Sequence, residues 1–392
     1  MRRVSGLRAA SAASLLLGLP ALLALPALLS GCGGAYELPS EVRRRPIPSD
    51  KSYQMVATWA SMDNVQDLLL TQGSGVQLFV LFNHGGAGTS TRGDLHLYPL
   101  TTPSPIAGVD FPTLFNPVAL AAGGDGRGAA LNRVFVLDQG DTALARTDPS
   151  TGRVTKLELY WRVREFGLLG GDTLGTFTDT TVAYVRGIAA DADGAVYLAC
   201  IAITMIVDPS DARIRTRTFA PRIYRYLRGP RYPGIVPPDP RMPGSNWHRD
   251  STWAVEDGTG QGYLQDPRGL VWSATGGRAL YSCDFGKNVV QKLSDQLKNT
   301  GLLNIDTGEN ALSLYRPTGV SVSTDGFIYV CDTGNQRVMR FAPDGSYVQR
   351  VDHELDAFSQ PLSNPVAVAA NDTVAYVADR GRSEIIRYKR RP

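Results

Sequence analysis

The chain has 392 residues, of which 43% are hydrophobic and 20% are charged, a balance typical of globular rather than disordered proteins. The formal charge is +3, and the first 31 residues hold Arg2, Arg3 and Arg8 but no acid, so the rest of the chain is close to neutral. We therefore expect no bulk electrostatic attraction to nucleic acid. The 41 glycines and 25 prolines indicate many turns, which favours an all-β fold.

Residues 1–31 have the pattern of a secretory signal peptide, with a basic start followed by the apolar core "AASAASLLLGLPALLALPALL". The core ends in "LSGC", which resembles the lipobox of bacterial lipoproteins. The resemblance implies that the Cys32 thiol is acylated, palmitate being one such chain, and that Cys32 becomes the new N-terminus. The alternative is a transmembrane anchor, but Pro20 and Pro26 argue against it. Acyl chains would hold the protein on a lipid bilayer.

Residues 32–51 form a polar, proline-bearing segment that we interpret as a lipidated tether. Gly33 follows the cysteine, and the resemblance to lipoproteins implies outer-membrane sorting because an aspartate that retains lipoproteins at the inner membrane is absent. The expected location is thus the bacterial cell envelope, with the chain lipid-anchored to the outer membrane. Arg43–Arg45 either contact anionic headgroups or belong to a solvated linker.

A repeat dominates the remaining chain, and its clearest copy is "RPTGVSVSTDGFIYVCDTGNQRVMRFAPDGSYVQRV", residues 316–351. The Pro-x-Gly start of this copy recurs at Pro267 and, as Pro-Val-Ala, at Pro365, which are spaced 50 and 48 residues from Pro317. The next apolar run, "FIYVCDTG", recurs as "ALYSCDFG", "VAYVADRG", "VFVLDQG" and "VYLAC". A third run follows as "QRVMRF", "NVVQKL", "SEIIRY" and "TALART", and the full copies add a fourth, such as "SYVQRV", so each unit is expected to hold four short strands.

Four-stranded units at a period of about 50 residues indicate the blades of a β-propeller. The amino-acid sequence of the copies is similar to the NHL repeat. The resemblance implies an all-β, six-bladed, NHL-like propeller over residues 52–392. The copies are expected to begin near six residues: Asn64, Pro117, Val185, Pro267, Pro317 and Pro365.

The last copy has only three strands, whereas a spare strand, "YQMVATWA" at residues 53–60, precedes the first copy. The simplest closure pairs this spare strand with residues 383–389, on the outer edge of blade six. Such pairing would leave no open edge in the ring.

Two sets of repeated side chains are interpreted as structural. An aspartate precedes an x-Gly turn in four copies, where it is expected to accept backbone hydrogen bonds rather than act in catalysis; the four are Asp138, Asp284, Asp332 and Asp379. Three further cysteines occupy equivalent or adjacent positions in different blades, too far apart for a disulfide, and are expected to be buried free thiols; they are Cys200, Cys283 and Cys331.

Extra length is expected in three blade-to-blade connections, at residues 160–181, 353–363 and, longest, 221–265, which we interpret as an insertion in the propeller. Long connections on one face indicate a recognition surface. The insertion is rich in residue types found at binding hot spots, and the candidate binding residues are Tyr224, Arg225, Tyr226, Arg228, Trp247 and Arg249. Two alternatives stay open, namely a recognition loop and a loop that caps the ring. Binding of an anionic polymer is a narrower form of the first.

The expected function is that of a lipid-anchored binding scaffold for an envelope protein or glycan, acting as a monomer without a cofactor. The alternative is a propeller hydrolase or lyase with an axial metal, because some related propellers, the amidating lyases and the lactonases, bind Zn or Ca on the axis. Weak candidate ligands are His84, His248 and His353, but they share no repeat position. No Gly-x-Ser-x-Gly elbow, P-loop or dinucleotide fingerprint is present, so we expect a binding module rather than an enzyme.

Overall fold

The computed structural model describes residues 53–71, 76–84, 93–112, 114–125, 131–139, 143–147, 154–159, 161–207, 210, 215–229, 246–256, 263–275, 277–294, 299–303, 313–351 and 361–391. The predicted signal peptide, Cys32, the tether and His353 lie outside these residues. None of the helical structure in the described part of the chain is long and apolar enough to cross a membrane.

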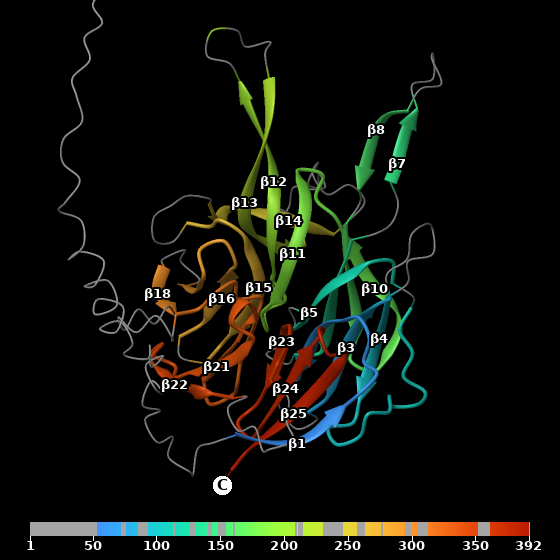
Figure 1. Ribbon diagram of the computed structural model, residues 1–392. Helices are drawn as coiled ribbons and strands as arrows, with labels where there is room; N and C mark the ends of the chain where they lie inside the picture. Colours follow the sequence, from blue (N-terminus) through green and yellow to red (C-terminus); the bar gives the residue numbers. More distant parts are fainter. Residues whose placement is uncertain are drawn as a thin grey trace, which may run out of the picture. The chain divides into compact units, whose positions relative to one another are not determined.

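The described residues form a six-bladed β-propeller, as predicted (Figure 1). Blades one and two contain β2 (Val65–Leu70), β3 (Leu78–Asn83) and β4 (Gly93–Tyr98), then β5 (Pro117–Gly123), β6 (Arg133–Asp138), β9 (Arg162–Gly167) and β10 (Gly170–Phe177). Blades three and four contain β11 (Val182–Ala190), β12 (Val196–Val207), β13 (Arg215–Arg228) and β14 (Trp247–Val255), then β15 (Pro267–Ser273), β16 (Ala279–Asp284), β17 (Val289–Ser294) and β18 (Asn299–Leu303). Blades five and six contain β19 (Gly319–Val322), β20 (Ile328–Asp332), β21 (Arg337–Phe341) and β22 (Tyr347–Arg350), then β23 (Pro365–Ala370), β24 (Val374–Asp379), β25 (Glu384–Arg390) and β1 (Tyr53–Trp59).

The six sheets are arranged in a ring because the first strand of each blade contacts the first strands of both neighbouring blades, in the order β2, β5, β11, β15, β19, β23 and back to β2. The second strands lie between the faces of adjacent blades. They are therefore buried on both sides and consist of nearly continuous apolar runs, such as "ALYSCD" in β16 and "VAYVAD" in β24.

The first strands approach each other closely around the axis, and this explains the glycine of the Pro-x-Gly start. A Cβ added at Gly187 would lie 1.7 Å from the carbonyl oxygen of Arg268 in the next blade. The corresponding distances from Gly269 and Gly319 to the next blade's carbonyl oxygens are 2.2 and 2.8 Å. No larger side chain fits at these three positions without a shift of the backbone.

The ring is closed by β1, which forms the outer edge of blade six and confirms the predicted closure. The antiparallel register runs from Tyr53 opposite Arg390 to Trp59 opposite Ile385. Both aromatic side chains of β1 are buried: Tyr53 shares a hydrogen bond of 2.7 Å with the Tyr329 hydroxyl of blade five, and Trp59 stacks on Tyr98 of blade one. The N-terminal strand therefore joins three blades.

Blade one has three strands in the described part of the chain, whereas the other five blades have four. An irregular segment, residues 99–112, follows β4 in place of a fourth strand. The Ile106 amide donates a 2.7 Å hydrogen bond to the Leu97 carbonyl, which places this segment on the outer edge of β4.

The structure corrects the expected connections of blades two and three. Residues 162–177 form the two outer strands of blade two, and residues 221–228 and 247–255 lie in the two outer strands of blade three, so these stretches are not loops. "TALART" is not the third strand of blade two either, because β7 (Ala143–Thr147) pairs with β8 (Val154–Leu159) in a separate hairpin, while β6 pairs with β9. The apolar pattern did not reveal which run would pair with β6, since pairing is decided by contacts distant in sequence.

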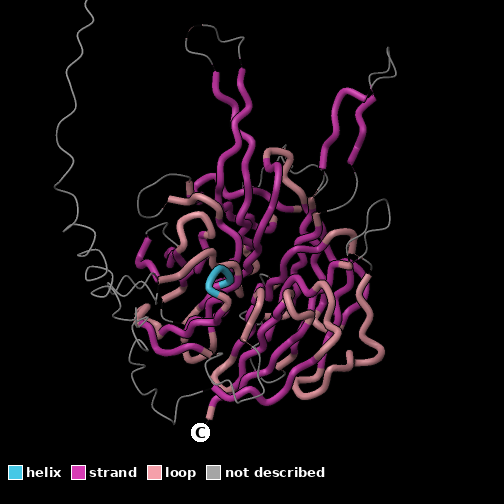
Figure 2. The backbone as a smooth tube through the Cα atoms, in the orientation of Figure 1, coloured by secondary structure: helices cyan, strands magenta, loops and turns pink. Residues whose placement is uncertain are grey.

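Extra length lies instead in the connections between the second and third strands of blades two and three, and in residues 229–246 between β13 and β14. Blade two has the β7–β8 hairpin there, and in blade three β12 and β13 stay paired as far as Val207 and Arg215, well beyond the pairing of β11 with β12, which ends at Ala202. Both hairpins project from the same side of the ring (Figures 1 and 2).

Deleting residues 53–60 should lower the melting temperature of the chain markedly, because β25 becomes an exposed edge and the ring loses a buried tryptophan. Loss of the Trp59 contacts alone is expected to cost about 3–5 kcal/mol. Thermal unfolding followed by circular dichroism measures this effect. A matched deletion of residues 33–40 should leave the melting temperature unchanged, and equal melting of the two deletions would contradict closure by β1.

Candidate functional site

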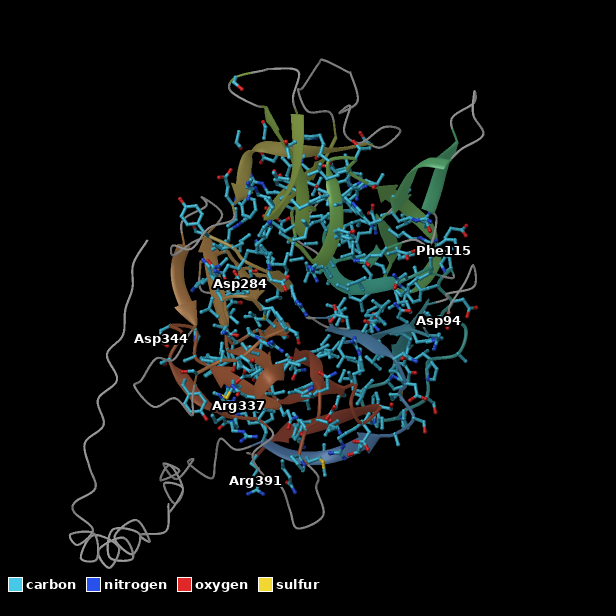
Figure 3. All side chains as sticks on the ribbon, turned by 45° about the horizontal axis from the view of Figure 1, so that its top comes forward. Asp94, Phe115, Asp284, Arg337, Asp344 and Arg391 are labelled. Carbon is cyan, nitrogen blue, oxygen red and sulfur yellow. The ribbon has the colours of Figure 1, made fainter. Side chains whose placement is uncertain are left out.

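A cavity of about 380 Å³ lies on the propeller axis and is lined by residues from all six blades. Figure 3 shows the side chains of the blades gathered around this axis. The lining comes from the first halves of the inner strands and from the turns that follow the second strands. The cavity therefore lies toward the face of the ring from which the two long hairpins project.

One set of lining residues occupies the same position in every repeat, immediately before the Gly or its equivalent at the start of the inner strand. These residues are Gln66, Val118, Arg186, Arg268, Thr318 and Val366. Side chains of a strand alternate between opposite directions. In blades three, four and five the neighbouring Gly is pressed against the next blade, so there the residue before it is the one whose side chain lines the cavity.

In three blades, the residue that follows the repeated aspartate forms a hydrogen bond with the next blade. Gln139 Nε2 donates to the carbonyl oxygen of Val185, Thr333 Oγ1 donates to that of Pro365 at 2.7 Å, and Arg380 Nε donates to that of Val65 at 3.3 Å. In each case the acceptor lies at the start of the next blade's inner strand. These bonds fix the side chains that surround the mouth of the cavity.

The repeated aspartates have the structural role that the sequence indicates. All four are fully buried. Asp379 accepts hydrogen bonds from the Ser363 and Asn364 amides at 2.7 and 2.8 Å, and from the Gly381 amide at 3.1 Å. Equivalent bonds to the residues that precede the inner strand are made by Asp138, Asp284 and Asp332. Each aspartate thus joins the turn after its second strand to the entry of its own blade.

Three guanidinium groups line the cavity, and the described carboxylates that pair with them are fewer than the guanidinium groups. Arg186 Nε and Arg268 Nη2 share one carboxylate, Asp266, at 3.2 and 2.9 Å. Arg380 Nη2 donates to Gln66 Oε1 at 2.7 Å, and no described carboxylate lies within ion-pair distance of Arg380. Partial desolvation lowers the pKa of Arg380, although the residue is exposed.

Asp67 is the acidic side chain of the cavity lining in the described part of the chain. Its two oxygens accept the Leu68 and Leu120 amides, each at 2.8 Å, and so connect blade one to blade two. Burial raises the pKa of Asp67 to about 7, although the two backbone hydrogen bonds oppose the shift. No basic side chain contributes to this shift.

The predicted binding residues do not form one surface, because they lie on both faces of blade three. Tyr226 and Trp247 are buried against blade two, where Arg228 lies over the Trp247 ring at 4.7 Å. Tyr224 packs on the same side, under the Arg249 guanidinium at 4.4 Å. Arg225 lies on the other side, where it pairs with Asp250 and covers Trp253 at 5.6 Å.

The blade-two side of this group is organised by a buried carboxylate that the sequence did not single out. Asp179 accepts hydrogen bonds from the Tyr226 hydroxyl at 3.1 Å and from Arg249 Nη1 at 3.2 Å. Glu165 of blade two is likewise buried and pairs with Arg228 Nη2 at 2.6 Å. These contacts belong to the packing between blades two and three.

The described histidines are dispersed. His84 pairs with Asp94 at 3.0 Å on the surface, and His248 Nδ1 lies 2.7 Å from the Gly229 carbonyl oxygen. No group of three or more metal-binding side chains is present among the described residues. The cavity lining combines one carboxylate with three guanidiniums, a donor set that does not fit a divalent cation. The cysteine prediction is confirmed, since Cys200, Cys283 and Cys331 are free and buried.

Comparison with known proteins agrees with the repeat. Residues 314–341 match the NHL repeat. No curated protein sequence matches the chain. Among solved structures, the PQQ-bound aldose sugar dehydrogenase of Streptomyces coelicolor is similar at 14% identity and a TM-score of 0.46, over 87% of this chain and 99% of that one. Virginiamycin B lyase of Staphylococcus aureus is similar at 12% identity and a TM-score of 0.40, over 86% and 99% of the two chains.

We expect Asp67 to make the protein less stable as the pH rises toward 8. The carboxyl has a pKa of about 7 when folded, against ~3.9 in an unfolded chain, so the folded state binds more protons between these values. Its stabilising contribution is full below the unfolded pKa and is lost as the pH rises through the folded pKa. Melting temperatures from pH 4 to pH 8 should fall less steeply in Asp67→Asn than in the parent. The exposed Asp344→Asn is the matched control, and a constant difference between parent and Asp67→Asn would contradict this assignment.

Proposed function

We propose that this protein is a binding module of the bacterial cell envelope, anchored to the outer membrane by lipid on Cys32, which captures an envelope protein or a glycan. The observation that carries the proposal is the placement of the two long hairpins. Both extend connections between the second and third strands of neighbouring blades, and both stand on the face toward which the axial cavity lies.

The physical argument is that added loop length costs little free energy of closure wherever it occurs. The long hairpins of two adjacent blades both stand on the face with the cavity, and recognition is a common reason for such an arrangement. The polar side chains of the cavity are amides, a hydroxyl, one carboxylate and guanidiniums. These groups suit the binding of a polar ligand, and nothing in the lining favours the enzymatic alternative.

Shortening the hairpins should abolish capture and preserve the ring. Residues 203–219 and 140–160 are each replaced by Asn-Gly, a pair that favours tight hairpin turns. Tagged parent and variant are incubated with solubilised envelope and with envelope glycans, and bound material is compared. A matched control replaces residues 343–345, a turn on the opposite face, by Asn-Gly and should bind as the parent does. Partners held equally by the shortened variant would contradict the proposed face.

The anchor is tested separately. Cys32→Ser removes the thiol that the lipobox resemblance marks for acylation, and the variant should lose its partition into membranes on cell fractionation. Ser30→Ala is the matched control, because it alters the same stretch and leaves the thiol in place. A Cys32→Ser protein that partitions with membranes as the parent does would show that the anchor assignment is wrong.

A further inference from the structure

The cavity contains a cation that the described protein does not neutralise. Arg380 is exposed at the mouth, its Nε and Nη2 are held by the Val65 carbonyl and Gln66, and its Nη1 has no partner in the described part of the chain. Two further guanidiniums, Arg186 and Arg268, share a single carboxylate. The attraction of an anion to a guanidinium depends on how much of its charge is already neutralised, so an anion entering the cavity gains the attraction that the described carboxylates leave unused.

The shape of the available groups favours a carboxylate. A guanidinium presents planar donors that match a carboxylate or a phosphate, and here the three arginines come from blades three, four and six, on different sides of the axis. Asp67 lines the same cavity. With a pKa of about 7, Asp67 carries part of a negative charge near neutral pH. That charge repels a dianion such as phosphate more strongly than a monoanion, because the repulsion scales with the ligand charge.

The neutral part of the lining provides hydrogen-bonding groups for hydroxyls. Asn116 uses its side-chain oxygen to accept from Asn83, which leaves Nδ2 without a partner in the described residues. Gln139 uses Nε2 to hold Val185, which leaves Oε1 equally without a partner. A donor and an acceptor thus line the cavity beside the guanidiniums, as a hydroxylated ligand requires.

We propose that the axial cavity binds a hydroxylated monocarboxylate of about monosaccharide size, such as a uronate. The carboxylate lies against Arg380 with Arg186 and Arg268 around it, and the hydroxyls contact Asn116 and Gln139. The cavity volume of about 380 Å³ is at the lower end of small-ligand sites. The inference deepens the glycan branch of the proposed function and rests on it for the source of the ligand, a free sugar acid or the end of an acidic glycan.

The test is calorimetric titration of the full chain with D-glucuronate. The matched ligands are its neutral methyl ester, which keeps the hydroxyls, and inorganic phosphate, which keeps the charge. Glucuronate should bind, and the other two should bind at least tenfold more weakly, a difference of ~1.4 kcal/mol. Titration with an oligogalacturonide then distinguishes a free sugar acid from the end of an acidic glycan. Only a cavity that is open to the end of a glycan chain should bind the oligogalacturonide as well as it binds the free uronate.

Arg380→Gln should reduce glucuronate affinity at least tenfold, ~1.4 kcal/mol, because it removes the unneutralised charge. Arg382→Gln is the matched control on the same turn, since Arg382 pairs with Glu384 at 2.8 Å and does not line the cavity. Should Arg380→Gln melt early, Arg186→Gln serves in its place, because Arg186 lies at a half-exposed position and its removal leaves Asp266 paired with Arg268.

Absence of glucuronate binding, equal binding of the methyl ester or phosphate, or undiminished binding by a folded arginine variant would each overturn the inference. These outcomes are independent of the hairpin experiment. Uronate binding that persists in the hairpin-shortened variant supports the cavity site even if no envelope partner is captured. A captured partner together with a cavity that binds no uronate would leave the proposed function standing and remove this ligand.

Discussion

The close approach of the six inner strands around the axis is the constraint on which the structure depends. At Gly187 the next blade's backbone leaves no room for a Cβ, and Gly269 and Gly319 meet the same limit. With these positions closed in blades three, four and five, the preceding residues Arg186, Arg268 and Thr318 provide the side chains that line the axis. The packing that makes the ring compact therefore also selects the side chains of the cavity.

Such close packing requires that each blade enters the ring at a fixed height, and two sets of hydrogen bonds provide this. The buried aspartates hold the entry of the inner strand to the turn of the same blade, as Asp379 does with Ser363 and Asn364. The residue after the aspartate then holds the next blade, as Thr333 does through the Pro365 carbonyl. A buried carboxylate that accepts several backbone amides is well satisfied, so these residues are structural although they resemble a ring of acids around a site.

The same framework gives the cavity its charge. Two of the six axial positions, Arg186 and Arg268, carry arginine, and Arg380 lies in the turn after β24. Among the described residues one acid, Asp266, pairs with Arg186 and Arg268. Asp67 does not neutralise the third, because its oxygens are taken up by the Leu68 and Leu120 amides. Among the described residues, the rigid ring holds a guanidinium without a carboxylate partner beside amide side chains that each have one group available, an arrangement preorganised for a ligand. The aromatic residues of blade three instead pack between blades.

The sequence by itself determined the fold, because the six copies, their period and the spare strand at residues 53–60 are local patterns of apolar runs and turns. It also identified the aspartates as structural, since an Asp before x-Gly has the same local geometry in each copy. Only the tertiary structure decided which strands pair in blades two and three, because β pairing joins segments distant in sequence, as β6 joins β9 across the β7–β8 hairpin. The axial cavity was likewise decided by tertiary structure. Gln66, Arg186, Arg268 and Arg380 lie far apart in the chain, and only closure of the ring brings their side chains around one space.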